Sequence, residues 1–240
     1  MTKNSNPVVN RVDCARCDSR NKSIFCDLSK EELSELDDTK GCSNYKKRHH
    51  IFKEGSYPHG LYCLNSGKVK LFQMAENGRE QIVRLAKPGD VLGYRSLLSG
   101  EQYTSTAEAI EDCSVCFIPK EVVMKMLQTN SSLSMNIMKL LSGDLKKAEH
   151  TITELAQKPV RERMAEVLLL LKEIYGFEKD NVTLGVILTR EEISNIAGTA
   201  TETSIRILAE FKDEGLIKFN GKKIVIPDLK KLTYAANVHD

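Results

Sequence analysis

The sequence of residues 189–226, TREEISNIAGTATETSIRILAEFKDEGLIKFNGKKIVI, decides the fold of the C-terminal part of the chain. Thr189 with Glu192 three positions later forms a capping box that begins a helix, and Gly198 ends that helix. A second helix shows one apolar face at helical spacing: Ser204, Ile207, Leu208 and Phe211. Asn220-Gly221 between two short apolar runs predicts a hairpin. Two short helices joined by a glycine turn and followed by a hairpin are typical of a winged helix-turn-helix.

The outward face of the second helix carries the residues that could contact bases. These are Thr201, Glu202, Ile205 and Arg206. Arginine can bond two acceptors of guanine, and a carboxylate can accept from the cytosine amino group. The alternative is an ordinary ion pair on a solvated face, or a capping role for Glu202. We place Thr189 and Thr199 in the same DNA-contacting set, and predict double-stranded DNA as a partner.

Composition limits the function classes. The chain has 240 residues, 41% of them hydrophobic, and a formal charge of +2, so bulk charge does not itself indicate nucleic acid. We find no signal peptide and no apolar run long enough to span a bilayer, so we expect a cytoplasmic protein without a membrane partner. No serine–histidine–aspartate set or phosphate-binding loop is evident, and we do not expect an enzyme.

Residues 31–125 have the pattern of an antiparallel β-roll. Short alternating apolar runs recur between glycine-bearing turns, and Asn77-Gly78 is the strongest hairpin signal among them. This spacing predicts a compact antiparallel sandwich or barrel.

The pattern of residues 126–157 predicts a long helix with a narrow apolar seam. Its members follow one another by steps of three and four: Met138, Leu141, Leu145, Ala148, Ile152 and Leu155. This a/d spacing favours a parallel coiled-coil dimer, and the alternative is a core helix within one subunit. Pro159 ends the segment. We assign residues 158–240 to the winged-helix domain.

Residues 1–30 form a polar arm with Cys14, Cys17 and Cys26. Seven cysteines in a cytosolic chain indicate metal binding, redox chemistry or core packing rather than structural disulfides. We interpret Cys42 and Cys63 as packing or surface residues.

This order of a cysteine arm, a β-roll, a dimer helix and a winged helix resembles the CRP/FNR family of bacterial regulators. Gly89-Asp90, Gly93, Ser99-Gly100 and residues 199–208 carry the likeness. The resemblance implies an α+β protein with a cyclic-nucleotide-binding-type antiparallel β-roll (jelly roll), a long dimerisation helix and a C-terminal winged helix-turn-helix. It also implies a homodimer on a palindromic site and RNA polymerase as a partner.

The same resemblance assigns roles on the recognition helix. Glu202 and Arg206 fall on the family's base-reading glutamate and arginine, and Thr201 on a variable position that tunes specificity. Ile205 departs from the small or polar residue often found there, and it could pack on a thymine methyl group.

The sensed signal is predicted from what the β-roll lacks and what the arm contains. The family's cyclic-nucleotide members hold ribose and phosphate with Gly-Glu and Arg-Ser pairs, whereas this chain has Tyr94 after Gly93 and Tyr103-Thr104 at the second position. These differences argue against cyclic AMP, and we expect the β-roll to respond instead to a redox, oxygen or nitric-oxide type of signal. The cysteines resemble those of the oxygen-sensing, FNR-like branch, and this implies a [4Fe–4S] cluster on Cys14, Cys17, Cys26 and Cys116.

Alternatives remain open at this point. The gap between Cys17 and Cys26 is longer than in that branch, so zinc, thiol redox chemistry or no cofactor at all are the competing interpretations. In Cys113-x2-Cys116 the two side chains should face opposite sides of a strand. A regulator that responds to a cyclic nucleotide or another small ligand without a metal, and an iron–sulfur electron carrier that does not bind DNA, are the competing functions.

One seam position bears on assembly. The oxygen-sensing branch carries an acidic residue inside the dimer seam, and the matching residue here is the apolar Ala148. We therefore expect a dimer even without a cofactor.

Overall fold

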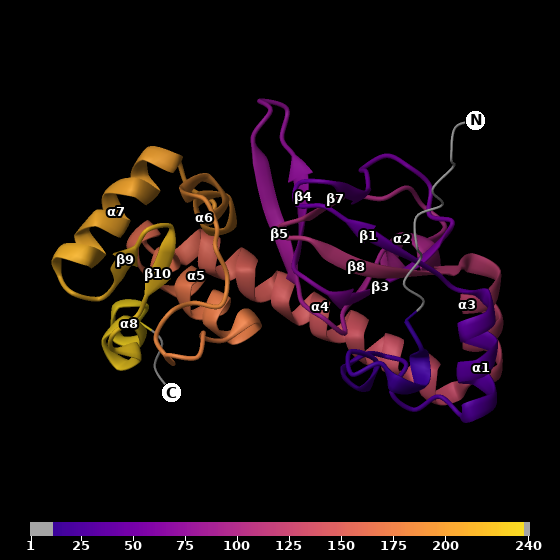
Figure 1. Cartoon of the computed structure of the whole chain (residues 1–240). Helices are drawn as coiled ribbons and strands as arrows, with labels where there is room; N and C mark the ends of the chain where they lie inside the picture. Colours follow the sequence, from indigo (N-terminus) through magenta and orange to yellow (C-terminus); the bar gives the residue numbers. More distant parts are fainter. Residues whose placement is uncertain (1–11, 238–240) are drawn as a thin grey trace, which may run out of the picture. The chain divides into compact units, whose positions relative to one another are not determined.

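The computed structural model describes residues 12–237 of the chain (Figure 1). Residues 1–11 of the predicted arm and 238–240 of the predicted winged-helix domain lie outside the described residues. Two four-stranded antiparallel sheets form the N-terminal part, ordered β1-β8-β3-β6 and β2-β7-β4-β5. Their strands are β1 (Gly41–Tyr45), β2 (His50–Phe52), β3 (Gly60–Ser66), β4 (Val69–Met74), β5 (Glu80–Ala86), β6 (Val91–Leu92), β7 (Thr106–Ala109) and β8 (Cys113–Pro119). This arrangement confirms the predicted β-roll.

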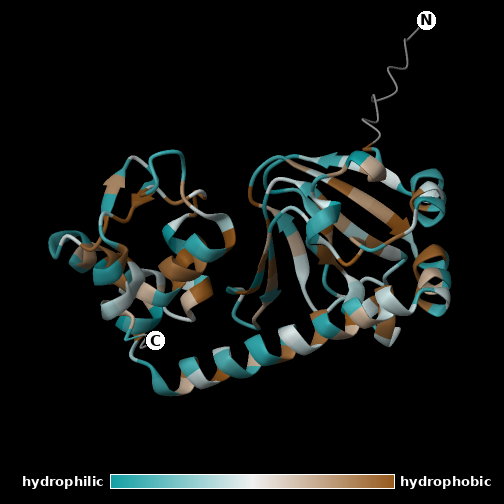
Figure 2. Ribbon diagram, turned by 90° about the horizontal axis from the view of Figure 1, so that it is seen from below, coloured by the Kyte–Doolittle hydropathy of each residue, from teal (hydrophilic) through white to brown (hydrophobic). Residues whose placement is uncertain are grey.

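The inner faces of the two sheets enclose one hydrophobic core. Phe52 and Ala107 from one sheet pack in the same cluster as Leu64 and Val115 from the other. In Figure 2 brown, hydrophobic stretches run along several of these strands, and many of the connecting loops are teal, that is, hydrophilic. The alternation of side chains along β8 therefore directs Cys113 and Val115 inward and leaves Cys116 on the outer face.

A second core covers the outer face of the β1-β8-β3-β6 sheet. It joins Leu61 and Ile118 of that sheet to apolar residues of the arm and of four helices. The arm contributes two short 3-10 turns (Cys14–Arg16 and Arg20–Lys22), and helix α1 (Lys30–Thr39) follows them. α1 begins with a capping box formed by Ser29 and Glu32. Helix α2 (Tyr94–Ser99) also packs in this part of the chain.

The helical segment after the roll is divided differently from our prediction. Helix α3 (Lys120–Thr129) ends before Asn130, and the long helix α4 (Ser131–Gln157) begins after it. Residues 126–129, which we placed at the start of the long helix, therefore belong to α3. The side chain of Asn130 accepts from the backbone N–H of Leu133 at 2.9 Å, so it caps the first turn of α4.

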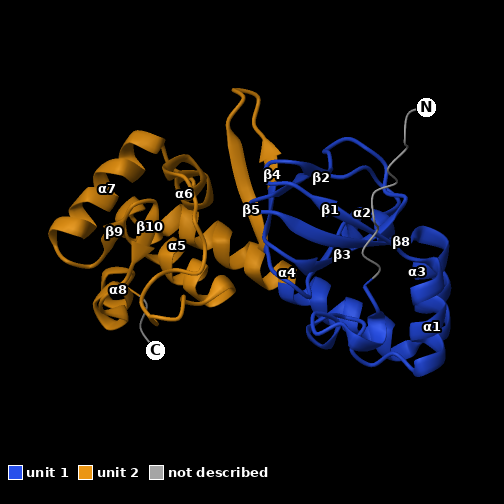
Figure 3. Cartoon of the chain, in the orientation of Figure 1, with its two compact units in different colours: residues 1–71, 86–143 blue, residues 72–85, 144–240 orange. Residues whose placement is uncertain are grey.

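The chain divides into two compact units (Figure 3). One comprises residues 1–71 and 86–143, and the other residues 72–85 and 144–240. The second unit holds the C-terminal elements: α5 (Val160–Tyr175), α6 (Arg190–Ala197), α7 (Thr201–Asp213), β9 (Lys218–Asn220), β10 (Lys223–Val225) and α8 (Leu229–Ala235). Helix α5 packs against α6, α7 and α8. Over residues 12–237, no helix combines the length and hydropathy that a bilayer crossing requires.

Candidate DNA-binding interface and cysteine cavity

Helices α6 and α7 are joined as the sequence predicts. The Thr189 hydroxyl accepts from the backbone N–H of Glu192 at 3.1 Å, and the Glu192 carboxylate accepts from the backbone N–H of Thr189 at 2.7 Å. Gly198 ends α6 with a left-handed backbone, φ +63°. Only glycine adopts that conformation at little cost, so the turn into α7 is fixed at this residue.

The exposed face of α7 carries three of the predicted base-contacting residues. Glu202, Ile205 and Arg206 are exposed, while Ile207, Leu208 and Phe211 are buried against the rest of the domain. The guanidinium of Arg206 bonds the Glu210 carboxylate at 2.5 Å, one turn further along the helix. An exposed ion pair of this kind contributes little to stability, so Arg206 can exchange its partner for DNA at small cost.

The two predicted threonines of the turn occupy less exposed positions. The Thr201 hydroxyl lies 3.1 Å from that of the buried Ser194, and it ties the start of α7 to α6. Thr199 is half-buried and donates its backbone N–H to the Ser194 carbonyl. Both residues therefore hold the turn in shape, whichever further contacts they make.

The wing is a two-stranded hairpin of β9 and β10. Phe219 pairs with Ile224 across it, and the Arg190 guanidinium lies 4.1 Å from the centre of the Phe219 ring. This cation–π contact fastens the wing to the first turn of α6. Lys218 and Lys222 on the hairpin are exposed, and such side chains suit DNA phosphates.

The predicted seam of α4 is mostly uncovered in the single chain. Met138 is 51% exposed, Leu145 62%, Ile152 67% and Leu155 44%. Ala148 is exposed too, whereas Leu141 is half-buried against the core beside α1 and α3. Large apolar side chains repeated along one helix at this exposure indicate a surface that a partner helix covers.

Three cysteines stand in one row across the outer face of the first sheet. In the strand register Cys116 of β8 lies directly opposite Cys42 of β1 on one side and Cys63 of β3 on the other. Residues paired in this way project to the same face of a sheet. The Sγ atoms of Cys42 and Cys116 are 2.9 Å apart.

The arm places two more cysteines over this row. Cys14, Cys17, Cys63 and Cys116 all line one small cavity of about 40 Å³, together with Lys40 and Phe25. Burial is the main reason that the pKa of each of Cys14, Cys63 and Cys116 is raised above that of a free thiol. For Cys14 the pKa rises to about 11.

A buried ammonium group lies beside these thiols. Lys40 donates to the Cys14 sulfur at 2.6 Å, and its Nζ lies 2.6 Å from the Asp37 carboxylate. The backbone N–H of Cys14 also donates to Asp37, at 3.0 Å. Burial alone lowers a lysine pKa, but the bonds to Asp37 and Cys14 outweigh it and hold the pKa of Lys40 above its usual value.

The remaining predicted ligand is placed elsewhere. Cys26 is exposed and does not line the cavity. Its carbonyl oxygen accepts from Arg20 at 3.0 Å, which fixes the backbone of the arm at this point. Cys113 faces the inner core, where its thiol donates to the backbone carbonyls of Glu111 and Lys68. Cys113 and Cys116 thus face opposite sides of β8, as their spacing predicts.

Comparison with known proteins matches both halves of this architecture. Family models describe residues 42–130 as a cyclic nucleotide-binding domain and residues 162–234 as a Crp-like helix-turn-helix domain. The electron transport regulator A of Shewanella oneidensis is 31% identical, over 94% of this chain and 90% of that protein. The fumarate and nitrate reduction regulatory protein of Vibrio cholerae is 30% identical, over 95% of this chain and 91% of that protein. The chain belongs to the CRP/FNR family of transcription regulators.

Solved structures agree with this assignment. FixK2 from Bradyrhizobium japonicum superposes with a TM-score of 0.74 at 25% identity, covering 84% of this chain and 100% of that one. The prediction of a DNA-binding transcription regulator of the CRP/FNR type is therefore confirmed, and so is the α+β fold.

The β-roll of this CRP/FNR protein holds aromatic rings at Tyr94 and Tyr103, the positions on which the prediction against cyclic AMP depends. Tyr94 is buried, and the Tyr103 ring stacks on Phe52 with the ring centres 4.0 Å apart. The ring of Tyr103 also lies 3.1 Å from the point where a Cβ on Gly93 would stand. The Arg95 guanidinium lies 6.0 Å from the centre of the Tyr94 ring, so a cation is near these rings, and the prediction against cyclic AMP stays a prediction.

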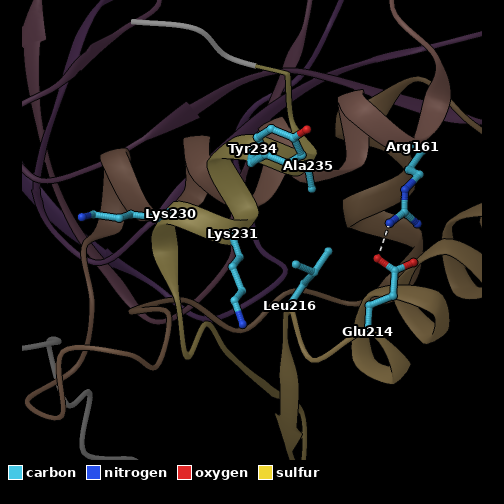
Figure 4. Close-up of a pocket in the computed structure, with 7 residues that line it drawn as sticks. All are labelled: Arg161, Glu214, Leu216, Lys230, Lys231, Tyr234 and Ala235. Atoms are coloured by element: carbon cyan, nitrogen blue, oxygen red, sulfur yellow. Dashed lines mark hydrogen bonds and ion pairs between the residues drawn. The ribbon is translucent and has the colours of Figure 1, made fainter.

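A separate hollow lies in the C-terminal unit between α5, the end of α7 and α8 (Figure 4). Arg161 and Glu214 form an ion pair across its rim, with N–O 2.5 Å, and Leu216 and Ala235 supply apolar lining. The Arg161 guanidinium also lies 4.8 Å from the centre of the Phe211 ring. These contacts join α5 to the recognition helix, and we assign them a structural role.

Sequence reasoning missed two members of the cysteine site. Cys63 lines the cavity and Cys42 touches Cys116, whereas we had interpreted both as packing or surface residues. One signal was available: both residues lie on short strand-like runs, as Cys116 does. Only the register between strands far apart in the sequence places the three in one row.

Proposed function

We propose that this regulator binds a palindromic DNA site as a homodimer, with α7 in the major groove. The observation that carries this proposal is the exposed face of α7, where Glu202, Ile205 and Arg206 stand clear of the domain core. The second subunit pairs through the exposed seam of α4. A dimer with two-fold symmetry then places one recognition helix in each of two half-sites. Lys218 and Lys222 of the wing are suited to the adjacent phosphates. RNA polymerase is the further partner that the family implies.

The test is Arg206→Ala, compared with the matched Lys212→Ala variant at the other end of the same helix. A high-affinity site is first selected from random DNA with the parent protein. We expect Arg206→Ala to lose about 1–3 kcal/mol on that site and to relax base choice, because a side chain that bonds a base edge contributes on that order. Lys212→Ala should keep the base preference. Equal binding of Arg206→Ala and parent to every sequence would refute the role of α7.

The signal that we propose is a redox or oxygen-type signal, received at the cysteine cavity. Four thiols of the described chain converge there, and thiolates are the ligands that iron–sulfur clusters take from proteins. No described group of three or more cysteine, histidine, aspartate or glutamate side chains stands close enough to hold a single metal ion. A mononuclear zinc site would therefore require these side chains to move closer together, and zinc stays the alternative to a cluster.

Cys14, Cys17 and Cys116 are three of the proposed [4Fe–4S] ligands. Two cysteines are candidates for the fourth ligand. Cys26 is the candidate from the sequence, and Cys63 is the candidate from the structure because it lines the cavity. When bound, such a cluster would supply an iron–sulfur group that reacts with oxidants. The cavity has room for only about one or two water molecules, so the arm must move outward to admit a cluster.

The deciding experiment is anaerobic reconstitution with iron and sulfide, followed by an absorption spectrum and an iron assay. We expect a coloured protein with four irons per chain. Cys26→Ser and Cys63→Ser, measured side by side, identify the fourth ligand by which of them loses iron. Cys113→Ser is the matched control, because that thiol faces the inner core. A colourless, iron-free parent protein would end the cluster proposal and leave the DNA-binding proposal intact.

A further inference from the structure

The row of Cys42, Cys116 and Cys63 contains one pair of sulfurs in direct contact. The Sγ atoms of Cys42 and Cys116 lie 2.9 Å apart. This separation is shorter than the contact distance of two unbonded sulfur atoms, and a bonded pair stands about 2.05 Å apart. The two side chains therefore already point at one another, and only a small movement separates the thiols from a disulfide.

The backbone of the two strands permits that bond. Cys42 and Cys116 are direct partners in the antiparallel register of β1 and β8. Opposed residues in antiparallel strands have Cα atoms about 4.5–5.5 Å apart, and disulfides span Cα separations of about 4.4–6.8 Å. Hydrogen-bonded and non-hydrogen-bonded pairs both fall within that range, so the disulfide can form without displacing either strand.

The two thiols differ in their access to solvent. Cys42 is half-buried on β1, an edge strand of its sheet, whereas Cys116 is 7% exposed on the neighbouring strand. A small oxidant therefore meets Cys42 first. Cys116 is at the same time part of the cysteine cavity, since it lines that cavity with Cys14, Cys17 and Cys63.

We propose that Cys42 and Cys116 form a reversible disulfide, and that this bond withdraws Cys116 from the cysteine cavity. Cys42 is then the thiol that the oxidant reaches first, and Cys116 is the thiol that resolves it. One state of the protein holds Cys116 as a thiol at the cavity, and the other holds it bonded to β1. The existence of the disulfide is independent of the proposed cluster. Its regulatory consequence rests on the proposed function of the cavity.

The oxidation is balanced with a peroxide as the oxidant. The Cys42 thiol loses its proton, and its sulfur attacks one oxygen of hydrogen peroxide. The O–O bond breaks, and Cys42 becomes a sulfenic acid. The departing hydroxide takes up the proton from Cys42 and forms water. The Cys116 sulfur then attacks the Cys42 sulfur, the S–S bond forms, and the Cys116 proton leaves with the hydroxyl group as a second water. Two electrons pass from the pair of thiols to the peroxide. A dithiol reductant reverses the step.

The first measurement locates the bond in the full-length, iron-free protein. The protein is treated with one equivalent of hydrogen peroxide, remaining thiols are alkylated, and a non-reduced tryptic digest is analysed by mass spectrometry. Residues 41–46 and 96–120 are the expected tryptic peptides that hold Cys42 and Cys116. We expect these two peptides joined, with a mass two hydrogen atoms below their sum, and separated again by reduction.

Three variants make the assignment specific. The peptide with Cys116 also contains Cys113, so Cys113→Ser must keep the cross-link. Cys63→Ser, which alters the other neighbour in the row, must keep it as well. Cys42→Ser must abolish it. A cross-link between Cys116 and Cys63 or an arm cysteine, or alkylation of both Cys42 and Cys116 after peroxide treatment of the folded parent, would overturn the proposal.

The second measurement separates this proposal from the cluster proposal. Parent and Cys42→Ser are oxidised, freed of peroxide and reconstituted anaerobically without a thiol reductant. We expect the oxidised parent to lose most of its iron uptake, Cys42→Ser to keep its uptake, and dithiothreitol to restore the parent. If the cross-link forms but iron uptake is unchanged by it, the regulatory role is wrong. If the reduced parent takes up no iron, the cluster proposal fails while the mass spectrum still decides the disulfide.

Discussion

Lys40 is a buried lysine whose ammonium group lies against both a carboxylate and a thiol. A buried ammonium group pays a large desolvation cost, and its partners must offset that cost. Here the partners are the Asp37 carboxylate and the Cys14 sulfur, both at 2.6 Å from Nζ. Burial raises the pKa of the Cys14 thiol, and the Lys40 ammonium group offsets only part of that rise. Lys40 therefore joins the end of α1 to the cysteine cavity both structurally and electrostatically.

We predict that Lys40→Met lowers the free energy of unfolding by about 1–3 kcal/mol at neutral pH, because it leaves Asp37 partly buried without its cation. Burial raises the pKa of Asp37, but the bonds from Lys40 and the Cys14 backbone outweigh it and hold that pKa below its usual range. A depressed carboxyl pKa stabilises the fold above the unfolded value near 3.9 and ceases to do so as the pH falls through the folded value.

The difference in unfolding free energy between parent and Lys40→Met should therefore be full at pH 7 and shrink as the pH falls below about 4. Urea unfolding followed by circular dichroism at several pH values measures it. The matched control is Lys125→Met, whose pair with Glu35 is exposed and should contribute under about 1 kcal/mol. A difference that stays constant down to pH 3, or equals that of the control, would contradict this account of Lys40.

Contacts between residues were predictable from the sequence where the two residues lie close together in the chain. Ser29 with Glu32, and Thr189 with Glu192, form their capping boxes within four residues, so the pattern of letters was sufficient. The cysteine cavity is different, because Cys42 and Cys116 are 74 positions apart and meet only through strand register. No local pattern specifies that register, and it depends on which hydrophobic faces pack together.

At the scale of elements, the capping box of α6 is the feature that the sequence identified first and the structure reproduces. We predict that Thr189→Ala removes about 1 kcal/mol from the local stability of α6, since the hydroxyl satisfies one N–H of the first turn. Hydrogen exchange by mass spectrometry should show peptides of α6 exchanging roughly fivefold faster.

Ser29→Ala is the matched control for this prediction, because the same box begins α1. It should accelerate exchange in α1 and leave α6 as it was. Unchanged exchange in α6 of Thr189→Ala would mean that α5 and α7, rather than the cap, hold this helix in place.

The break between α3 and α4 was less predictable. Asn130 stops one helix and caps the next, and a continuous apolar pattern conceals such a turn.

At the scale of the whole molecule, the exposed seam of α4 connects the sequence to the assembly. A hydrophobic stripe with Leu145 and Ile152 more than 60% exposed is costly in a single chain and stable when two copies pair. Ala148 lies between these residues in the seam, and it brings no charge to the interface. The sequence predicted this stripe because heptad spacing is itself a local pattern.

We predict that the iron-free parent is a dimer at micromolar concentration, and that Ala148→Asp raises the dissociation constant at least about tenfold, or about 1.4 kcal/mol. In a parallel pair the two carboxylates face one another across the seam, and like charges at an interface repel strongly. Light scattering over a dilution series measures the change.

Thr153→Asp, an exposed position of the same helix outside the seam, is the control and should leave the dimer intact. A monomeric parent, or equal effects of the two substitutions, would show that α4 does not pair through this seam. The palindromic site would then need another interface to bring two recognition helices together.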